Sequence, residues 1–127
     1  VLPIENGAVQ VGGAVNLTPA LNTATYNQAV AAVGFTGTAY DMGENSLVDV
    51  LLYATGISAG GSVRLDYSTD NTTWFPNNTT TYSITIADPH YVILGLKTGS
   101  RYIRVSTSDS SPFRTTNLKM TFSSKRN

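Results

Sequence analysis

The chain has 127 residues, and charged residues make up 13% of it, against about 25% in an ordinary soluble domain. Eight basic residues balance eight acidic ones, so there is no net charge to attract nucleic acid or an anionic membrane surface. The absence of Cys excludes disulfides and thiolate zinc sites from this chain. A domain of this length buries about two-thirds of the surface that its unfolded chain exposes, so it can fold without such links.

The N-terminal part, residues 1–34, is rich in small residues and has Tyr26 as its only aromatic residue. Such a segment buries little surface by itself, so we expect an arm that adds strands to a sheet or lies on a partner. Residues 26–33 fit either a short helix or an extended arm. The apolar residues that we predict to contact a partner are Leu2, Ile4, Val9, Val11, Val15 and Leu17.

Membrane insertion is not expected from this sequence. No stretch approaches the roughly 20 apolar residues that span a bilayer. The N-terminus has no basic region ahead of a hydrophobic one, which is typical of a mature soluble chain.

Five stretches of the remaining chain have the pattern of strands. Residues 63–67, 82–86 and 118–122 alternate apolar and polar side chains, which is typical of strands with one buried face. Residues 47–53 and 91–96 are apolar on both parities, which indicates burial of both faces or cover by a neighbouring subunit. Turn signals often recur after about ten residues, as in a sandwich. We therefore predict an all-β, single-domain antiparallel β-sandwich, jelly-roll-like, with its core at 35–127 and an extended N-terminal arm at 1–34.

The stretch SVRLDYSTDNTTWF contains the only Trp in the chain. Asp70 and Asn71 tolerate turn and left-handed conformations, so we expect the chain to reverse there. Trp74 then begins the returning strand, close to Tyr67 or Leu65 across the pair. Its ring is predicted to serve as a core or interface anchor, or else as a platform for a ligand. Tyr67, Trp74 and Phe75 are thus candidate interface or ligand-binding residues.

Arg101 and Arg104 complete this set of candidates. They are three residues apart in the strand RYIRV, so their side chains lie on opposite faces and at most one faces the core. An inward arginine would need an acidic partner or would have to reach the edge of the sheet.

No constellation in the sequence predicts catalysis. His90 is the only histidine and has no nucleophile motif beside it, so we expect a turn residue at a sheet edge. The acidic pairs Asp66 with Asp70 and Asp41 with Glu44 lack a supporting motif and are expected to form ion pairs. The Thr- and Asn-rich turn offers fewer oxygen ligands than a calcium loop needs. We predict no enzyme activity, no cofactor and no metal.

The strand VDVLLYATGI, followed by VRLDYSTDNTTWF and later RYIRVST, resembles a pattern of small all-β phage virion proteins over residues 37–105. STDNTT stands where that pattern commonly has S-D-G, which leaves the turn type open. The resemblance implies a non-enzymatic capsid decoration, or cement, protein. Such a protein would sit on the capsid exterior and stabilise the icosahedral shell as a homo-oligomer, a trimer or dimer. Its partner would be the major capsid protein, and the N-terminal arm would bind the shell.

A second resemblance is to discoidin-like carbohydrate-binding β-sandwich modules, which carry a strand like RYIRV after a loop with Ser, Asp and Trp. This resemblance implies that a sugar ring stacks on Trp74. Discoidin domains commonly bridge their termini with Cys, and this chain has none. A phage tail or receptor-binding component is a further alternative, and capsid decoration is the function that we predict.

Overall fold

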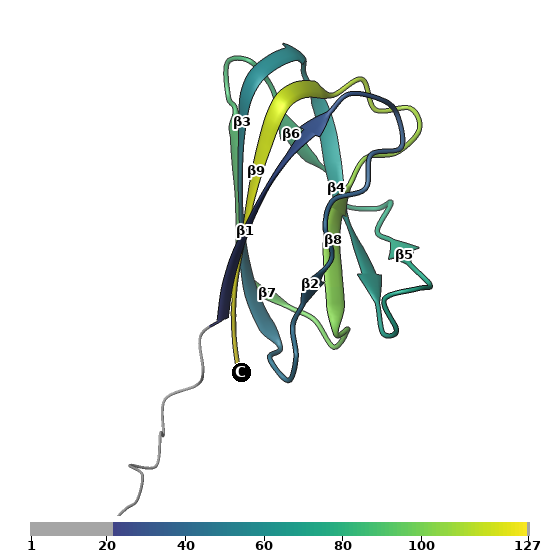
Figure 1. Ribbon diagram of the computed structural model, residues 1–127, viewed down its shortest axis with the longest axis vertical. Helices are drawn as coiled ribbons and strands as arrows, with labels where there is room; N and C mark the ends of the chain where they lie inside the picture. The colour runs from purple at the N-terminus through teal and green to yellow at the C-terminus, as the bar shows by residue number, and fades with distance from the viewer. Residues whose placement is uncertain (1–21, 127) are drawn as a thin grey trace, which may run out of the picture.

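The computed structural model describes residues 22–126, in which every regular element is a β-strand. Two antiparallel sheets pack face to face (Figure 1). The first has the strand order β1-β9-β3-β7, and the second has the order β2-β8-β4-β5 with β6 paired to β4. The strands are β1 Asn22–Val30, β2 Tyr40–Asp41, β3 Leu47–Ala59, β4 Gly61–Ser68, β5 Phe75–Pro76, β6 Tyr82–Ile84, β7 His90–Lys97, β8 Tyr102–Ser106 and β9 Arg114–Lys125. The predicted all-β antiparallel sandwich is confirmed.

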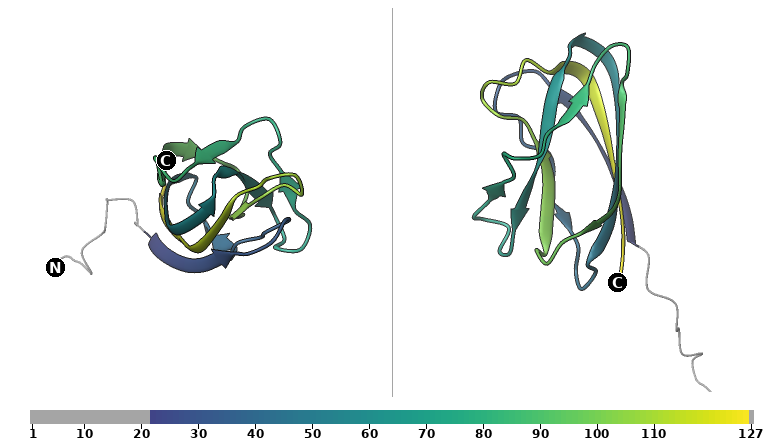
Figure 2. Two further views of the ribbon diagram at one scale, coloured as in Figure 1. Left: turned by 90° about the horizontal axis from the view of Figure 1, so that it is seen from above. Right: turned by 180° about the vertical axis from the view of Figure 1, so that it is seen from behind.

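The chain crosses repeatedly between the two sheets, as the views from above and behind show (Figure 2). Strands β1, β3, β7 and β9 belong to the first sheet, and the strands between them in sequence belong to the second. Jelly rolls bring distant segments together by such crossings. Residues far apart in the chain therefore become neighbours on each sheet.

The alternation along β3 shows how the core is built. Val48, Val50 and Leu52 point inward and are at most 3% exposed, whereas Leu51 and Tyr53 point outward. Complete burial of such an apolar side chain stabilises the fold by about 1.5–3 kcal/mol. The inward side chains of both sheets form one cluster, whose largest fully buried members are Phe113, Phe122, Met42, Leu65, Ile84, Ile103, Leu118 and Met120.

Phe122 on β9 packs against aromatic side chains of both sheets, one on β2 and one on β1. Its ring stacks on Tyr40 of β2 with a centroid distance of 5.1 Å, and Tyr26 of β1 lies 6.0 Å away. The Tyr40 hydroxyl is hydrogen-bonded to the Ser124 hydroxyl at 2.6 Å, which satisfies the buried polar end of the ring. The described part of the predicted arm thus adds an edge strand to the first sheet.

Several expectations change in detail. Of the two alternatives for residues 26–33, the extended one holds as far as Val30, where β1 still pairs with β9 after a register shift between Gln28 and Val30. The predicted strand at 82–86 ends at Ile84, because Thr85 and Asp88 exchange backbone hydrogen bonds in a turn that leaves Ile86 70% exposed. Residues 47–53 and 91–96 form strands, but the first is buried on one face only and the second is half-buried on one face. The predicted contact residues of the arm, Leu2, Ile4, Val9, Val11, Val15 and Leu17, lie outside the described residues.

Gly61, at the start of β4, lies directly against Phe113. A Cβ atom at this position would stand 2.6 Å from the Phe113 backbone nitrogen and 2.9 Å from its Cβ. Gly61→Ala should force the backbone apart and lower the free energy of unfolding by about 1–3 kcal/mol in urea denaturation. Gly99→Ala is the control, because no atom lies within 4 Å of its added methyl group, and its effect should stay within about 0.5 kcal/mol. Equal losses in the two variants would contradict this packing.

Candidate functional site

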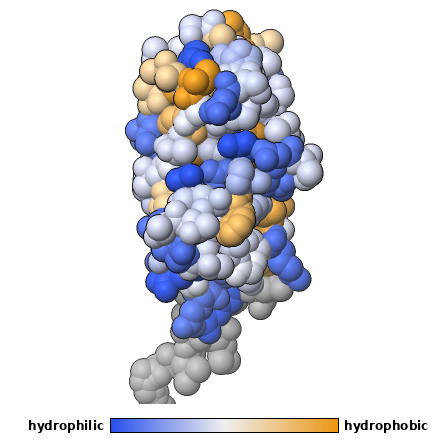
Figure 3. Space-filling view, turned by 90° about the vertical axis from the view of Figure 1, so that its right-hand side faces the viewer, coloured by the Kyte–Doolittle hydropathy of each residue, from blue (hydrophilic) through white to orange (hydrophobic). Residues whose placement is uncertain are grey.

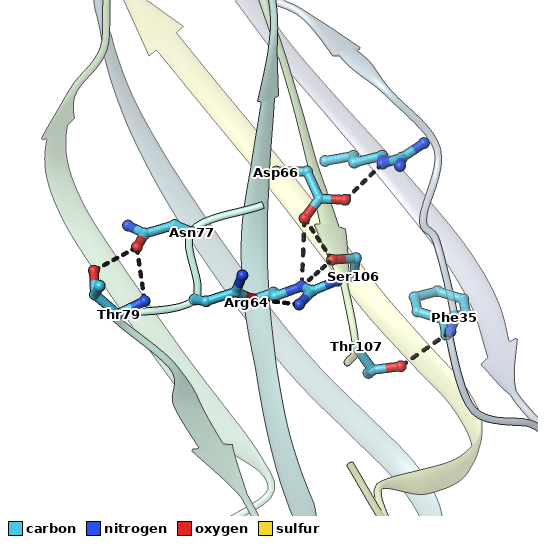
Figure 4. Close-up of polar contacts among 9 residues, drawn as sticks. Phe35, Arg64, Asp66, Asn77, Thr79, Ser106 and Thr107 are labelled. Atoms are coloured by element: carbon cyan, nitrogen blue, oxygen red, sulfur yellow. Dashed lines mark hydrogen bonds and ion pairs between the residues drawn. The ribbon is translucent and has the colours of Figure 1, made fainter. Parts of the chain in front are cut away.

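A buried carboxylate lies at the centre of the outer face of the second sheet. Asp66 on β4 points away from the core, yet it is only 2% exposed. The strand register sets Arg104 of β8 opposite it, and the Arg104 Nε donates a hydrogen bond to Asp66 Oδ2 at 2.9 Å. The Ser106 hydroxyl donates to Asp66 Oδ1 at 2.6 Å (Figure 4). These charge-assisted contacts compensate for much of the cost of removing the carboxylate from water.

Trp74 packs on the arginine of this ion pair. The guanidinium carbon of Arg104 lies 4.1 Å from the centroid of the indole ring, which is a cation–π contact. Trp74 is half-buried and lies outside the core cluster. It does not stack across the strand pair as expected, because Phe75 is the residue opposite Tyr67, and Trp74 lies just before β5 with its ring at Arg104.

Arg64 borders the same cluster from β4. Its Nε donates to the Ser106 hydroxyl at 3.1 Å, and its Nη1 donates to the Asn78 side-chain carbonyl. Figure 4 shows Arg64, Asp66 and Ser106 grouped on this face. Arg64 Nε lies 3.6 Å from Asp66 Oδ1, which is too long for a hydrogen bond. One carboxylate therefore faces two guanidinium groups and is hydrogen-bonded to only one of them.

Arg101 lies apart from this cluster. Its Nε and Nη2 donate to the two Asp41 carboxylate oxygens at 2.9 and 3.1 Å, and its guanidinium lies 5.3 Å from the Tyr102 ring centroid. The Arg101 hydrogen bond, with a second from the Gly43 N–H, lowers the pKa of Asp41. Arg101 precedes β8 and is exposed, so neither predicted arginine faces the core. Figure 3 shows a hydrophilic band across this side of the molecule, with its apolar residues scattered.

The two ion pairs should differ in their importance for stability. Asp66→Asn keeps the shape of the side chain but leaves Arg104 without its anion, and it should lower the free energy of unfolding by about 3 kcal/mol. Asp41→Asn removes the partner of an exposed arginine and should have a much smaller effect, since solvent screens that pair. Urea denaturation of both variants measures the difference. A small loss in Asp66→Asn would show that the buried network is dispensable.

The turn that precedes Trp74 is held by Asp70. Its Oδ1 accepts hydrogen bonds from the Thr73 and Thr72 backbone N–H groups at 2.8 and 2.9 Å, and from the Ser68 hydroxyl at 3.0 Å. Asn71 has a φ of 62°, the left-handed conformation that the sequence predicted here. The predicted chain reversal is confirmed.

The Thr73 and Thr72 N–H groups and the Ser68 hydroxyl lower the pKa of Asp70, because they favour its charged form. The stabilisation that Asp70 gives the turn should be complete above its ordinary pKa of 3.8 and be lost as the pH falls through the lower folded value. A carboxyl carbon NMR titration should give a midpoint below 3.8. Ser68→Ala should raise that midpoint, and a midpoint above 3.8 in the unmodified chain would contradict the turn geometry.

The remaining aromatic candidates lie opposite each other on β4 and on the edge strand β5. Tyr67 is half-buried against the core, and burial raises the pKa of its phenol. Phe75 on β5 is 64% exposed. Whether either contacts a partner stays a prediction.

The outer face of the first sheet carries a group of exposed apolar side chains. Leu51 and Tyr53 on β3 are 39% and 41% exposed, and Val92 and Leu94 on β7 are 53% and 70% exposed. The register places Leu51 beside Val92, so these four residues form one area, here called the β3–β7 patch. Its surface has a hollow of about 270 Å³, bordered also by His90 and Lys119. In the sequence, this patch is indicated by the apolar residues at both odd and even positions of residues 47–53 and 91–96.

His90 and Glu44, two further ionisable residues, contact side chains of the same chain. His90 begins the edge strand β7, and its ring stacks on Tyr53 at a centroid distance of 4.6 Å. Glu44 accepts a hydrogen bond from Arg126 at 3.1 Å. Among residues 22–126 no group of acidic, His or Cys side chains could hold a metal ion. The same range has no helix that is long and apolar enough to cross a bilayer.

Comparison with known proteins gives a likeness of fold. No family model matches the chain, and no curated protein sequence is similar to it. A solved structure titled "Bacillus endospore appendages form a novel family of disulfide-linked pili" is similar, with a TM-score of 0.50 and 13% sequence identity. The match covers 87% of this chain and 90% of that chain. At this identity the likeness shows a shared all-β fold, and the resemblance to phage virion proteins stays a prediction.

Proposed function

We propose that this chain is a non-enzymatic structural subunit that associates with copies of itself in an assembly outside the cell. The observation that carries the proposal is the β3–β7 patch, where four large apolar side chains on two adjacent strands are between 39% and 70% exposed. A contiguous apolar area on a folded domain marks an interaction surface. The fold likeness to a pilus protein supports the same class of function, since that protein is described as an assembled appendage.

Association through this patch would be non-covalent. The described neighbour is disulfide-linked, whereas this chain has no Cys. The apolar surface that four partly exposed side chains remove from water would drive contact, at about 25 cal/mol for each square ångström buried. Repetition of one such contact in a symmetric assembly multiplies its effect through high effective concentration.

A virion is the specific assembly that the sequence resemblance suggests. In that form the chain would bind the major capsid protein on the capsid exterior and stabilise the assembled shell, because a ligand that binds only the assembled state favours it by mass action. The arm would add contacts to the shell, through residues that lie outside the described range. An appendage or tail made of identical subunits is the alternative that the fold likeness supports.

Val92→Asp should weaken self-association, because it places a charge in an interface that excludes water. Val33→Asp is the matched control, since Val33 is 55% exposed against 53% for Val92 but lies beyond the end of β1 and away from the patch. Light scattering on a size-exclusion column should show oligomers for the unmodified chain and for Val33→Asp. The dissociation constant should rise by at least about 10-fold in Val92→Asp.

A monomer at all concentrations in the unmodified chain, or equal behaviour of the two variants, would overturn self-association through this patch. Electron microscopy of the concentrated protein, alone and mixed with empty capsids, separates the two assemblies. Filaments of the chain alone would favour the appendage, and discrete oligomers that decorate capsids would favour the cement protein.

A further inference from the structure

Arg64 is a half-buried cation whose hydrogen bonds go to neutral groups. Its side chain is 20% exposed, and its two partners are the Ser106 hydroxyl and the Asn78 amide carbonyl. Asp66, 3.6 Å away, already accepts hydrogen bonds from Arg104 and Ser106. The carboxylate neutralises one of the two guanidinium groups, so about one positive charge stays uncompensated on this face.

The uncompensated charge borders a pocket. A hollow of about 230 Å³ opens beside Arg64 between β4, the segment that follows β5, and the segment that follows β8. Its polar lining side chains are those of Ser62, Arg64, Asn78, Thr81 and Ser108, and no carboxylate is among the residues that line it. The Asn78 carbonyl accepts from Arg64, which leaves its amide N–H groups as donors toward other partners.

Three other arginines of the described chain differ from Arg64, because each donates directly to a carboxylate: Arg104 to Asp66, Arg101 to Asp41 and Arg126 to Glu44. Arg114 resembles Arg64 in that it donates to neutral groups, two backbone carbonyls, and it borders a different hollow. Arg64 differs from Arg114 in that hydroxyl and amide side chains surround its hollow, so an external anion bound there would meet both a cation and neutral polar groups.

We infer that this pocket binds the carboxylate-bearing ring of an acidic saccharide, such as a uronic acid unit. The planar guanidinium of Arg64 suits a planar carboxylate, which it can contact through the N–H groups not engaged by Ser106 and Asn78. The hydroxyl and amide groups around it can both donate to and accept from ring hydroxyls. The hollow of about 230 Å³ is larger than a carboxylate group alone, so it has room for the ring that carries the carboxylate. This site is separate from Trp74 and from the β3–β7 patch, and it does not depend on the proposed self-association.

Titration of the full chain with glucuronate, followed by NMR of backbone amides and the Arg Nε–H signals, tests the site. Saturable shifts should centre on Arg64, Asn78 and Thr81, with a dissociation constant on the order of 1 mM for a ligand of this size. Glucose, which has the ring without the carboxylate, and acetate, which has the carboxylate without the ring, should each bind at least about 10-fold more weakly. Raising the salt concentration should weaken glucuronate binding.

Two kinds of variant distinguish a binding role from a structural one. Arg64→Gln should abolish the shifts, and Thr81→Val should weaken binding about 5-fold, because it removes one hydroxyl and keeps the shape of the side chain. Thr81 is exposed, so this second variant keeps the test valid if Arg64→Gln impairs folding. Thr80→Val, at the exposed position next to it, is the matched control and should bind like the unmodified chain.

Three results would overturn the inference. Absence of saturable shifts up to about 50 mM glucuronate, far above the expected dissociation constant, would exclude the site. If glucose bound as tightly as glucuronate, the carboxylate would contribute nothing to affinity. If acetate bound as tightly as glucuronate, the sugar ring would contribute nothing. Unchanged affinity in both Thr81→Val and a folded Arg64→Gln would place the ligand elsewhere.

Discussion

The rest of the molecule depends on the burial of two inner sheet faces against each other. Neither sheet could exclude water from Val50, Leu65 or Phe122 by itself, and together they form one continuous cluster. Phe122 is central because its ring contacts side chains of both sheets, while the polar end of Tyr40 is satisfied at Ser124. Because the inner faces form the core, only the two outer faces and the edges of the sheets can contact other molecules.

The two outer faces have opposite chemical character. The second sheet carries a polar network in which a buried carboxylate, two arginines and a tryptophan hold together β4, β8 and the turn before β5. The first sheet has hydroxyl pairs such as Thr25 with Thr121 on one side and the β3–β7 patch on the other. A subunit with two such faces could bind its own kind on one side and present a charged, hydroxyl-lined pocket on the other. The pocket beside Arg64 and the patch are independent, because they use different sheets.

Burying the charged groups of the polar network removes them from water, which costs free energy. Well-placed hydrogen bonds within the fold offset this cost. Asp66 is compensated by direct hydrogen bonds from Arg104 and Ser106, both set opposite or near it by the β4–β8 register. Asp66 is almost completely buried, which strengthens its attraction to Arg104 and makes the loss of one partner costly. By contrast, Arg101 and Asp41 meet in solvent, where their attraction is screened. The same two residue types thus have different energetic roles because their exposure differs.

The sequence by itself determined the all-β class, the strands near 47–53, 63–67, 91–96 and 118–122, and the turn at Asp70 and Asn71, because alternation and turn chemistry are local properties. Apolar residues on both parities of β3 and β7 also marked the place of the exposed β3–β7 patch, and its cover by a neighbouring subunit stays a prediction. Only the tertiary structure decided the partners of Arg64 and Arg104, the placement of Trp74 over a guanidinium, and the pocket at Asn78 and Thr81. These depend on which strands lie side by side and in what register. That pairing joins residues about 40 positions apart and is fixed by the closure of the whole core.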